Sequence, residues 1–159
     1  ATAALRRQQL AASVDFSEVE AENWRALAQV YAERADGRVV TGTGFAVRPD
    51  GLVMTAGHVV EGRESDDPAT RLAVQFAGSR QVWPASVEGT TPSADLAVLR
   101  VHNLAGEIPV VSGLDARPDT VKAGSPVALL GYPLGGAVEP SPGEGDRLGR
   151  PLLTVGVVP

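Results

Sequence analysis

The sequence contains no cysteine among its 159 residues. This absence excludes disulfide bonds, zinc sites built on thiolates and a cysteine nucleophile, although it does not identify a cellular compartment. Long apolar runs are also absent: none approaches the about 18 residues that a membrane-spanning helix needs. We therefore expect no membrane span in this sequence.

Basic residues are too few to give the chain a positive surface. There are 14 lysines and arginines against 19 aspartates and glutamates, for a net charge of −5. This balance argues against a nucleic-acid partner and leaves no polybasic patch for anionic membranes. Hydrophobic residues make up 43% of the chain, which at this length predicts one core and one compact domain.

The acidic residues do not suggest a metal site. Glu64, Asp66 and Asp67 cluster within residues 63–68. They lack the alternating spacing of a calcium-binding loop, in which every second residue supplies an oxygen. We expect a solvated loop here, and neither a metal nor a cofactor in the protein.

The segment 42–62 concentrates residues that can carry chemistry. Residues 41–47 are typical of a strand, 48–51 (Arg-Pro-Asp-Gly) of a turn, and 52–55 of a second short strand. This hairpin places His58 at its mouth rather than on a helix face. A histidine in that position can be a base, a metal ligand or a spectator.

Asp95 is the carboxylate whose position best distinguishes among these roles of His58. It opens the almost continuously apolar run 95–101, which predicts a strand buried on both faces. A carboxylate at the edge of such a dry core needs a partner to stay charged. His58 suits that role, because a hydrogen bond from one ring nitrogen would fix the tautomer and leave the other nitrogen free to take a proton.

Three motifs together resemble a known family. They are T-G-T-G-F at 41–45, T-A-G-H-V-V at 55–60 and S-A-D-L-A-V-L at 93–99. The pattern, which can be followed over residues 26–158, is similar to the first barrel of chymotrypsin-fold serine peptidases of the HtrA/Deg type. The resemblance implies an all-β fold with a closed antiparallel six-stranded β-barrel.

In catalytic terms, the resemblance makes His58 the general base and Asp95 its orienting acid. Gly57 departs from the family, which more often carries alanine there, and we expect it to loosen the turn before the base.

The nucleophile of the family is missing from these residues. It lies in a G-x-S-G-G motif in the second barrel, and none of the nine serines here stands in such a motif. Ser125, between Gly124 and Pro126, comes closest, but it begins a strand that the family uses structurally. We therefore expect the serine to come from a second barrel, in the same precursor or in a second chain.

The resemblance therefore implies the His/Asp-bearing half of a trypsin-like serine endopeptidase, which is inactive alone and acts on polypeptides with a serine-bearing partner. The alternative is a non-catalytic pseudoprotease barrel that binds or regulates other proteins. The presence of both His58 and Asp95 favours the enzyme. Family resemblance alone favours an extracytoplasmic location, periplasmic or secreted.

Three regions are predicted along the chain. Residues 1–25 form a polar extension, helical in part, with residues 3–12 as a first candidate helix. Residues 26–132 form the barrel. Residues 133–159 are a linker rich in glycine and proline, followed by the first strand toward a second barrel.

Residues 17–37 carry conflicting signals. Apolar spacing favours one long helix, whereas the resemblance requires a strand leading into Gly42. We predict a helix from about Ser17 to Trp24, opened by a Ser17–Glu20 capping box, and then a strand over 26–33. Strands expected near 27–33, 39–47, 52–55, 72–76, 81–88 and 95–101, with 126–131, would close the barrel.

Overall fold

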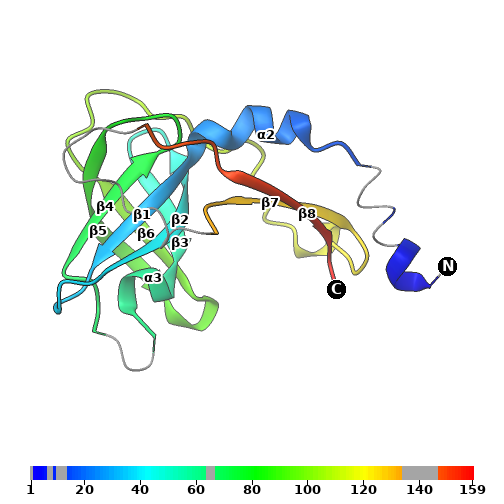
Figure 1. Cartoon of the computed structure of the whole chain (residues 1–159), viewed down its shortest axis with the longest axis horizontal. Coiled ribbons are helices and arrows are strands. Elements are labelled where there is room, and N and C mark those ends of the chain that lie inside the picture. Colours follow the sequence, from blue (N-terminus) through cyan, green and yellow to red (C-terminus); the bar gives the residue numbers. More distant parts are fainter. Residues whose placement is uncertain (1, 7–8, 10–13, 64–66, 134–146) are drawn as a thin grey trace.

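The computed structural model describes residues 2–6, 9, 14–63, 67–133 and 147–159. Figure 1 shows two parts: a barrel at one end, and a two-stranded arm that projects from it beneath the helix α2 (Ser17–Asn23). The predicted all-β class, the closed barrel and the N-terminal helix are confirmed.

Six strands close the barrel in the order β1-β2-β3-β6-β5-β4, and every neighbouring pair is antiparallel. The strands are β1 (Leu27–Glu33), β2 (Val39–Arg48), β3 (Leu52–Ala56), β4 (Arg71–Phe76), β5 (Val82–Thr91) and β6 (Leu96–Val101). Pairing between β1 and β4 completes the ring, so that each barrel strand has two partners and none offers a free edge.

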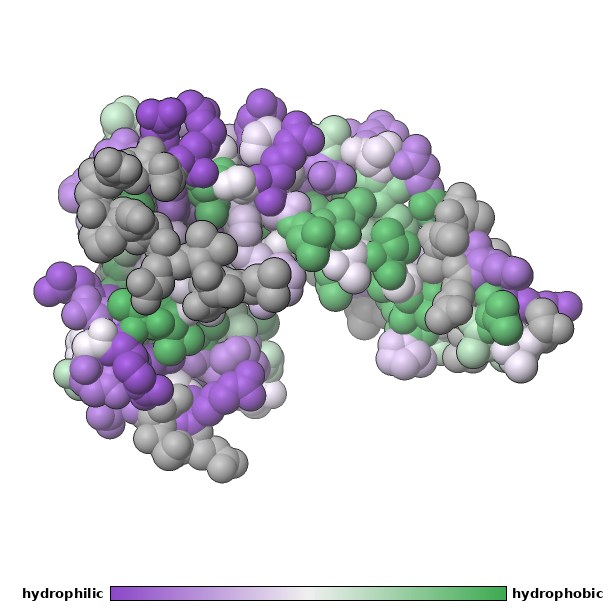
Figure 2. Space-filling model, in the orientation of Figure 1, coloured by the Kyte–Doolittle hydropathy of each residue, from purple (hydrophilic) through white to green (hydrophobic). Residues whose placement is uncertain are grey.

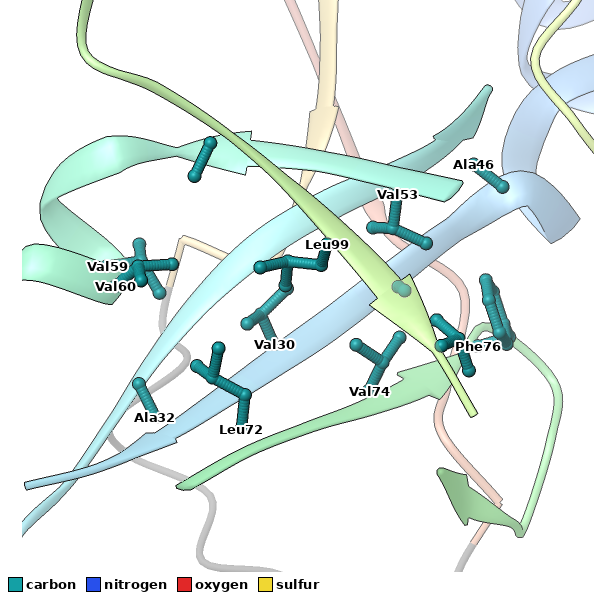
Figure 3. Close-up of a cluster of buried hydrophobic side chains, with 13 residues drawn as sticks. Val30, Ala32, Ala46, Val53, Val59, Val60, Leu72, Val74, Phe76 and Leu99 are labelled. Atoms are coloured by element: carbon teal, nitrogen blue, oxygen red, sulfur yellow. The ribbon is translucent and has the colours of Figure 1, made fainter. Parts of the chain in front are cut away.

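The core fills the interior of this barrel with small and branched aliphatic side chains and one aromatic residue, Phe76 (Figure 3). Its largest fully buried members are Leu99, Val30, Val53 and Val74. On β6 only alternate residues are buried, and Leu96 is 40% exposed. The expectation that 95–101 is buried on both faces is therefore wrong, because a barrel strand turns every second side chain outward.

Gly44, in β2, lies in close contact with β3 and with the side chains of the core. A Cβ atom on it would lie 2.8 Å from Cγ1 of Val53 and 3.1 Å from the Met54 carbonyl oxygen. We expect Gly44→Ala to lower the free energy of unfolding by about 1–3 kcal/mol through overpacking, measured by urea denaturation. Gly89→Ala is the matched control, because nothing lies within 4 Å of its added methyl group. Equal losses in the two variants would contradict this account.

The conflict over residues 17–37 resolves as predicted: α2 ends at Asn23, a 3-10 turn η1 (Trp24–Ala26) follows, and β1 begins at Leu27. The predicted capping box is wrong, because Ser17 lies inside the helix. Its backbone N–H instead donates to Oδ1 of Asp15, at 2.9 Å. Residues 3–6 are helical; most of the rest of the first candidate helix lies outside the described residues.

Two side chains fasten the end of α2 to the rest of the chain. The buried Asn23 accepts the backbone N–H of Ser112 at its Oδ1, at 2.8 Å. The guanidinium groups of Arg25 and Arg150 each lie over the Trp24 ring, 4.5 and 4.4 Å from its centroid. The contact with Arg150 joins the chain before β1 to the segment that leads into the last strand.

Two further strands form the arm. β7 (Pro126–Gly131) and β8 (Leu152–Val157) pair antiparallel, from Pro126 opposite Val157 to Gly131 opposite Leu152. Including residues 126–131 in the barrel is therefore wrong: the β1–β4 pairing has already closed it. Figure 2 shows apolar residues gathered on the arm. Leu129, Leu152 and Val155 are 69%, 57% and 42% exposed.

Three short helical turns complete the described elements: α3 (Gly57–Glu61), η2 (Pro92–Ala94) and η3 (Pro118–Thr120). α3 follows β3 without a break, and η2 leads directly into the residue before β6. Within the described part of the chain, no helix has both the length and the apolarity to cross a lipid bilayer.

Candidate active site

The pairing of β3 with β6 brings the two predicted site residues together. The last rung of that ladder joins Ala56 to Leu96. Asp95 stands one residue before this rung, and His58 stands two residues after it, in the first turn of α3. The expectation that His58 does not lie on a helix is therefore wrong, because α3 follows β3 directly. Residues 37 positions apart in sequence are therefore neighbours at one rim of the barrel.

His58 contacts Asp95 through two atoms. Its Nδ1 lies 2.8 Å from Oδ2 of Asp95, and its backbone N–H donates to Oδ1 of the same carboxylate, also at 2.8 Å. Both carboxylate oxygens of Asp95 thus accept hydrogen bonds from His58. Because an ionised carboxylate only accepts hydrogen bonds, Nδ1 is the protonated nitrogen and Nε2 is the acceptor.

Asp95 is held in an uncommon backbone conformation, with φ 52° and ψ 47°. Its carbonyl oxygen accepts the N–H of Gly57 at 2.8 Å. A Cβ atom on Gly57 would lie 3.2 Å from both the carbonyl carbon and Oδ1 of Asp95. The glycine that departs from the family pattern therefore has a packing role here, because it lets the two backbones approach closely.

The pair is open to solvent. The side chains of His58 and Asp95 are 36% and 56% exposed. The expectation of a carboxylate at the edge of a dry core is therefore wrong, because Asp95 precedes β6 and stands outside the barrel interior. The hydrogen bond from the His58 side chain, then that from its backbone N–H, lowers the pKa of Asp95 below the ordinary value of 3.8.

This lowered pKa has a measurable consequence. A carboxyl group with a lowered pKa in the folded state stabilises that state above its ordinary pKa, and loses this contribution as the pH falls through the lowered value. We expect the NMR titration of the Asp95 carboxyl carbon to have its midpoint below 3.8. In His58→Ala the midpoint should rise. An equal midpoint in both proteins would contradict the hydrogen bond.

The other ring nitrogen faces an arginine. Nη2 of Arg63 lies 3.5 Å from Nε2 of His58. Sequence reasoning treated Arg63 only as part of a charged loop and missed this contact. Among the residues that the structure describes, no serine hydroxyl hydrogen-bonds the His58 ring. The hydroxyl oxygen of Ser125 accepts the N–H of Lys122 at 3.1 Å, a role within a turn.

The second histidine lies elsewhere on the surface. Nε2 of His102 is 2.6 Å from Oγ of Ser86, and its backbone N–H donates to the Pro84 carbonyl. Both side chains are exposed. Of the described carboxylates, none forms a hydrogen bond or an ion pair with the His102 ring, so this Ser–His pair lacks an orienting acid.

Sequence reasoning also missed Arg34, which is buried beneath α3 and bonded to its carbonyl groups. The described residues contain no group of three histidine, aspartate or glutamate side chains that could hold a metal ion.

A closed six-stranded antiparallel barrel with a His–Asp pair at its rim corresponds to the first half of the chymotrypsin fold. In agreement, residues 42–157 match the family model of the trypsin-like peptidase domain. The chain therefore belongs to the trypsin-like peptidase family, and the relatives described next are of the HtrA/Deg type.

Several curated serine proteases are similar to the chain. It is 30% identical over 118 residues to the serine protease PepD of Mycobacterium tuberculosis, covering 72% of this chain and 25% of that protein. It is 33% identical over 118 residues to a probable periplasmic serine endoprotease DegP-like of Marinomonas sp. (74% and 23%). The mitochondrial serine protease HTRA2 of Drosophila persimilis is 34% identical over 97 residues (58% and 20%). The chain thus spans a quarter or less of these relatives.

Proposed function

We propose that this chain supplies the general base and the orienting acid of a trypsin-like serine endopeptidase, with His58 as the base and Asp95 as the acid. The observation that supports this most directly is the 2.8 Å contact between His58 Nδ1 and Asp95 Oδ2. It fixes the ring in the tautomer whose Nε2 can accept a proton from a serine hydroxyl.

The proposed reaction is acyl transfer from a peptide bond. His58 takes the proton of the attacking serine at Nε2 and returns it to the leaving amine, while Asp95 stabilises the charged imidazolium. Proton transfer of this kind contributes roughly 10²–10⁴ in rate. The oxyanion hole and the pocket for the substrate side chain would come from the serine-bearing part.

We propose that a second barrel carrying G-x-S-G-G covers the apolar surface of the β7–β8 arm. Leu129 and Leu152, which the register places on one face of the arm, and Val155 on the other face are exposed, and this supports the proposal because exposed apolar surface commonly marks a contact surface. The second barrel can belong to the same polypeptide or to another. On this proposal residues 26–132 are the first domain, whose closed barrel is formed by β1 to β6 and whose strand β7 lies in the arm, and residues 133–159 lead toward the second barrel.

The proposed substrate follows the names of all three relatives, and the proposed location follows the name of one of them, whereas another is named mitochondrial. Each of the three is named a serine protease or endoprotease, and one is named periplasmic. We accordingly propose a polypeptide substrate and an extracytoplasmic location for this protein. Fractionation of the producing cells with an antibody against the barrel tests the location, and recovery only with cytosolic markers would contradict it.

The test of the enzyme begins with the protein purified from the cells that make it. Intact mass spectrometry should reveal a G-x-S-G-G sequence, in the same polypeptide or in a companion. A fluorophosphonate probe should then label that serine when residues 1–159 are present and folded, and not after these residues are removed or unfolded. Labelling of no serine in a homogeneous, folded sample would instead favour the non-catalytic barrel.

A further inference from the structure

Arg34 is the most deeply buried charged residue among those described, with 3% of its surface exposed. It follows the last residue of β1 and reaches under α3. Its Nη1 donates to the Val60 carbonyl at 2.9 Å. Its Nη2 donates to the Val59 carbonyl at 2.9 Å and to the His58 carbonyl at 3.3 Å. One guanidinium group thus contacts three successive carbonyl groups of the helix that carries His58.

α3 needs such a partner because of its length. A helix of five residues is too short to be stable by itself, and the carbonyl groups of its last turn have no partner within the helix. The N–H of Gly62 meets the His58 carbonyl at 3.0 Å, and that of Ala69 meets the Val60 carbonyl at 2.7 Å. Arg34 reaches both of these carbonyls and also that of Val59.

The chemistry of the side chain matches this task. A guanidinium group presents its donors in a rigid planar fork, and a positive charge at the carbonyl end of a helix is favourable. Burying a charge is otherwise costly, and every hydrogen bond described for the Arg34 side chain goes to a backbone carbonyl. Its Nε has no partner. An apolar side chain would fill the space without this cost.

We propose that Arg34 is a positioning residue, which holds α3 so that the His58 ring keeps its hydrogen bond to Asp95. The proposal rests on the proposed role of His58.

Two glycines also bring neighbouring backbone close to α3. A Cβ atom on Gly42 would come within 2.6 Å of a Val59 methyl group, so β2 leaves the helix almost no room in that direction. At the start of α3, a Cβ atom on Gly57 would lie 3.2 Å from Asp95. The contacts at Gly42 and Gly57 and the hydrogen bonds of Arg34 together restrict the position of α3. Without the fork, the Val59 carbonyl loses its Arg34 donor and the His58 and Val60 carbonyls keep one donor each, so the carbonyl end of α3 is held less firmly and the direction of the imidazole can vary.

The test is an NMR measurement of His58 in the whole protein. Long-range proton–nitrogen spectra at a pH where the ring is neutral should show two well-separated ring nitrogens in the wild type, as expected for a single Nδ1–H tautomer. In Arg34→Met the two nitrogen shifts should move toward each other, because a ring released from Asp95 mixes its tautomers. Methyl signals of Val53 and Leu99 in the core report whether the barrel stays folded.

Arg71→Met is the matched control: this arginine is exposed and stands 3.7 Å from Glu33, on the strand beside β1. It should leave the His58 nitrogens unchanged. Unchanged nitrogens in a folded Arg34→Met would overturn the proposal and leave Arg34 with a purely structural role. If Arg34→Met does not fold, Arg34→Lys is the deciding variant, because lysine keeps the charge but not the planar fork. A change in the His58 nitrogen shifts in Arg34→Lys supports the proposal, and unchanged shifts overturn it.

The same variants separate this proposal from the proposed function. In an active serine-bearing enzyme, Arg34→Met should lower kcat by about 100-fold with little change in KM, as for a small misplacement of the base. An enzyme that never labels with fluorophosphonate would count against the peptidase, whereas the nitrogen shifts would still report whether Arg34 positions His58.

Discussion

His58→Ala is expected to lower kcat of the serine-bearing enzyme by about 10⁶-fold, the scale of loss when the base of such a triad is removed. Without the imidazole, no strong base remains in the described part of the site: Asp95 is a carboxylate, a far weaker base, on the Nδ1 side of the lost ring, and Arg63 is a cation. The measurement is the rate of peptide hydrolysis, with fluorophosphonate labelling as a direct count of activated serine.

His102→Ala is the control for this substitution. His102 bonds to Ser86 on the outer surface of the barrel, and its loss should change kcat by no more than about twofold. A His58→Ala enzyme that retained its activity would refute the proposed base. A loss confined to His102→Ala would move the site to the other histidine.

Asp95→Asn is expected to lower kcat by about 10⁴-fold, the loss typical of this class when the orienting acid becomes an amide. The reason lies in the two hydrogen bonds to His58. An amide can accept only at its oxygen, and its NH₂ group must face either the backbone N–H or Nδ1. In the first case the amide NH₂ group and the backbone N–H of His58, which are both hydrogen-bond donors, face each other. In the second the ring must carry its proton on Nε2, where it can no longer accept one from serine.

Kinetics and spectroscopy together test this prediction. The ring nitrogens of His58 should exchange their assignments between wild type and Asp95→Asn if the second arrangement forms. Asp36→Asn is the control, because Asp36 is an exposed carboxylate paired with Arg38 in the β1–β2 turn. If Asp95→Asn and Asp36→Asn had equal activity, the carboxylate would not be an orienting acid.

The strands were predictable from the sequence because their signals are local. Turn residues bound the hairpins, and the glycines of β2 mark close contacts that the structure contains. Periodicity alone failed at residues 17–37, where it favoured one long helix. The resemblance corrected it, because β1 owes its conformation to pairing with β2 and β4 rather than to its own spacing.

The site was predictable only in part. The motifs around His58 and Asp95 located the pair, but they carried no information on its exposure, which depends on where the rim of the barrel lies. Arg34 and Arg63 were missed for a related reason. Arg34 reaches carbonyls 24 to 26 positions away, and a long side chain gives no sequence pattern that names its distant partner.

The pairing of Ala56 with Leu96 also determines when the His58–Asp95 pair can form. These residues are 40 positions apart (96 − 56), so β3 and β6 meet only after the intervening chain has been made. A slip of one residue in that rung would displace Asp95 by about 3.3 Å and turn its neighbours to the opposite face. On the proposed function, a nascent or misregistered chain therefore holds an imidazole without its carboxylate and cannot yet activate a serine.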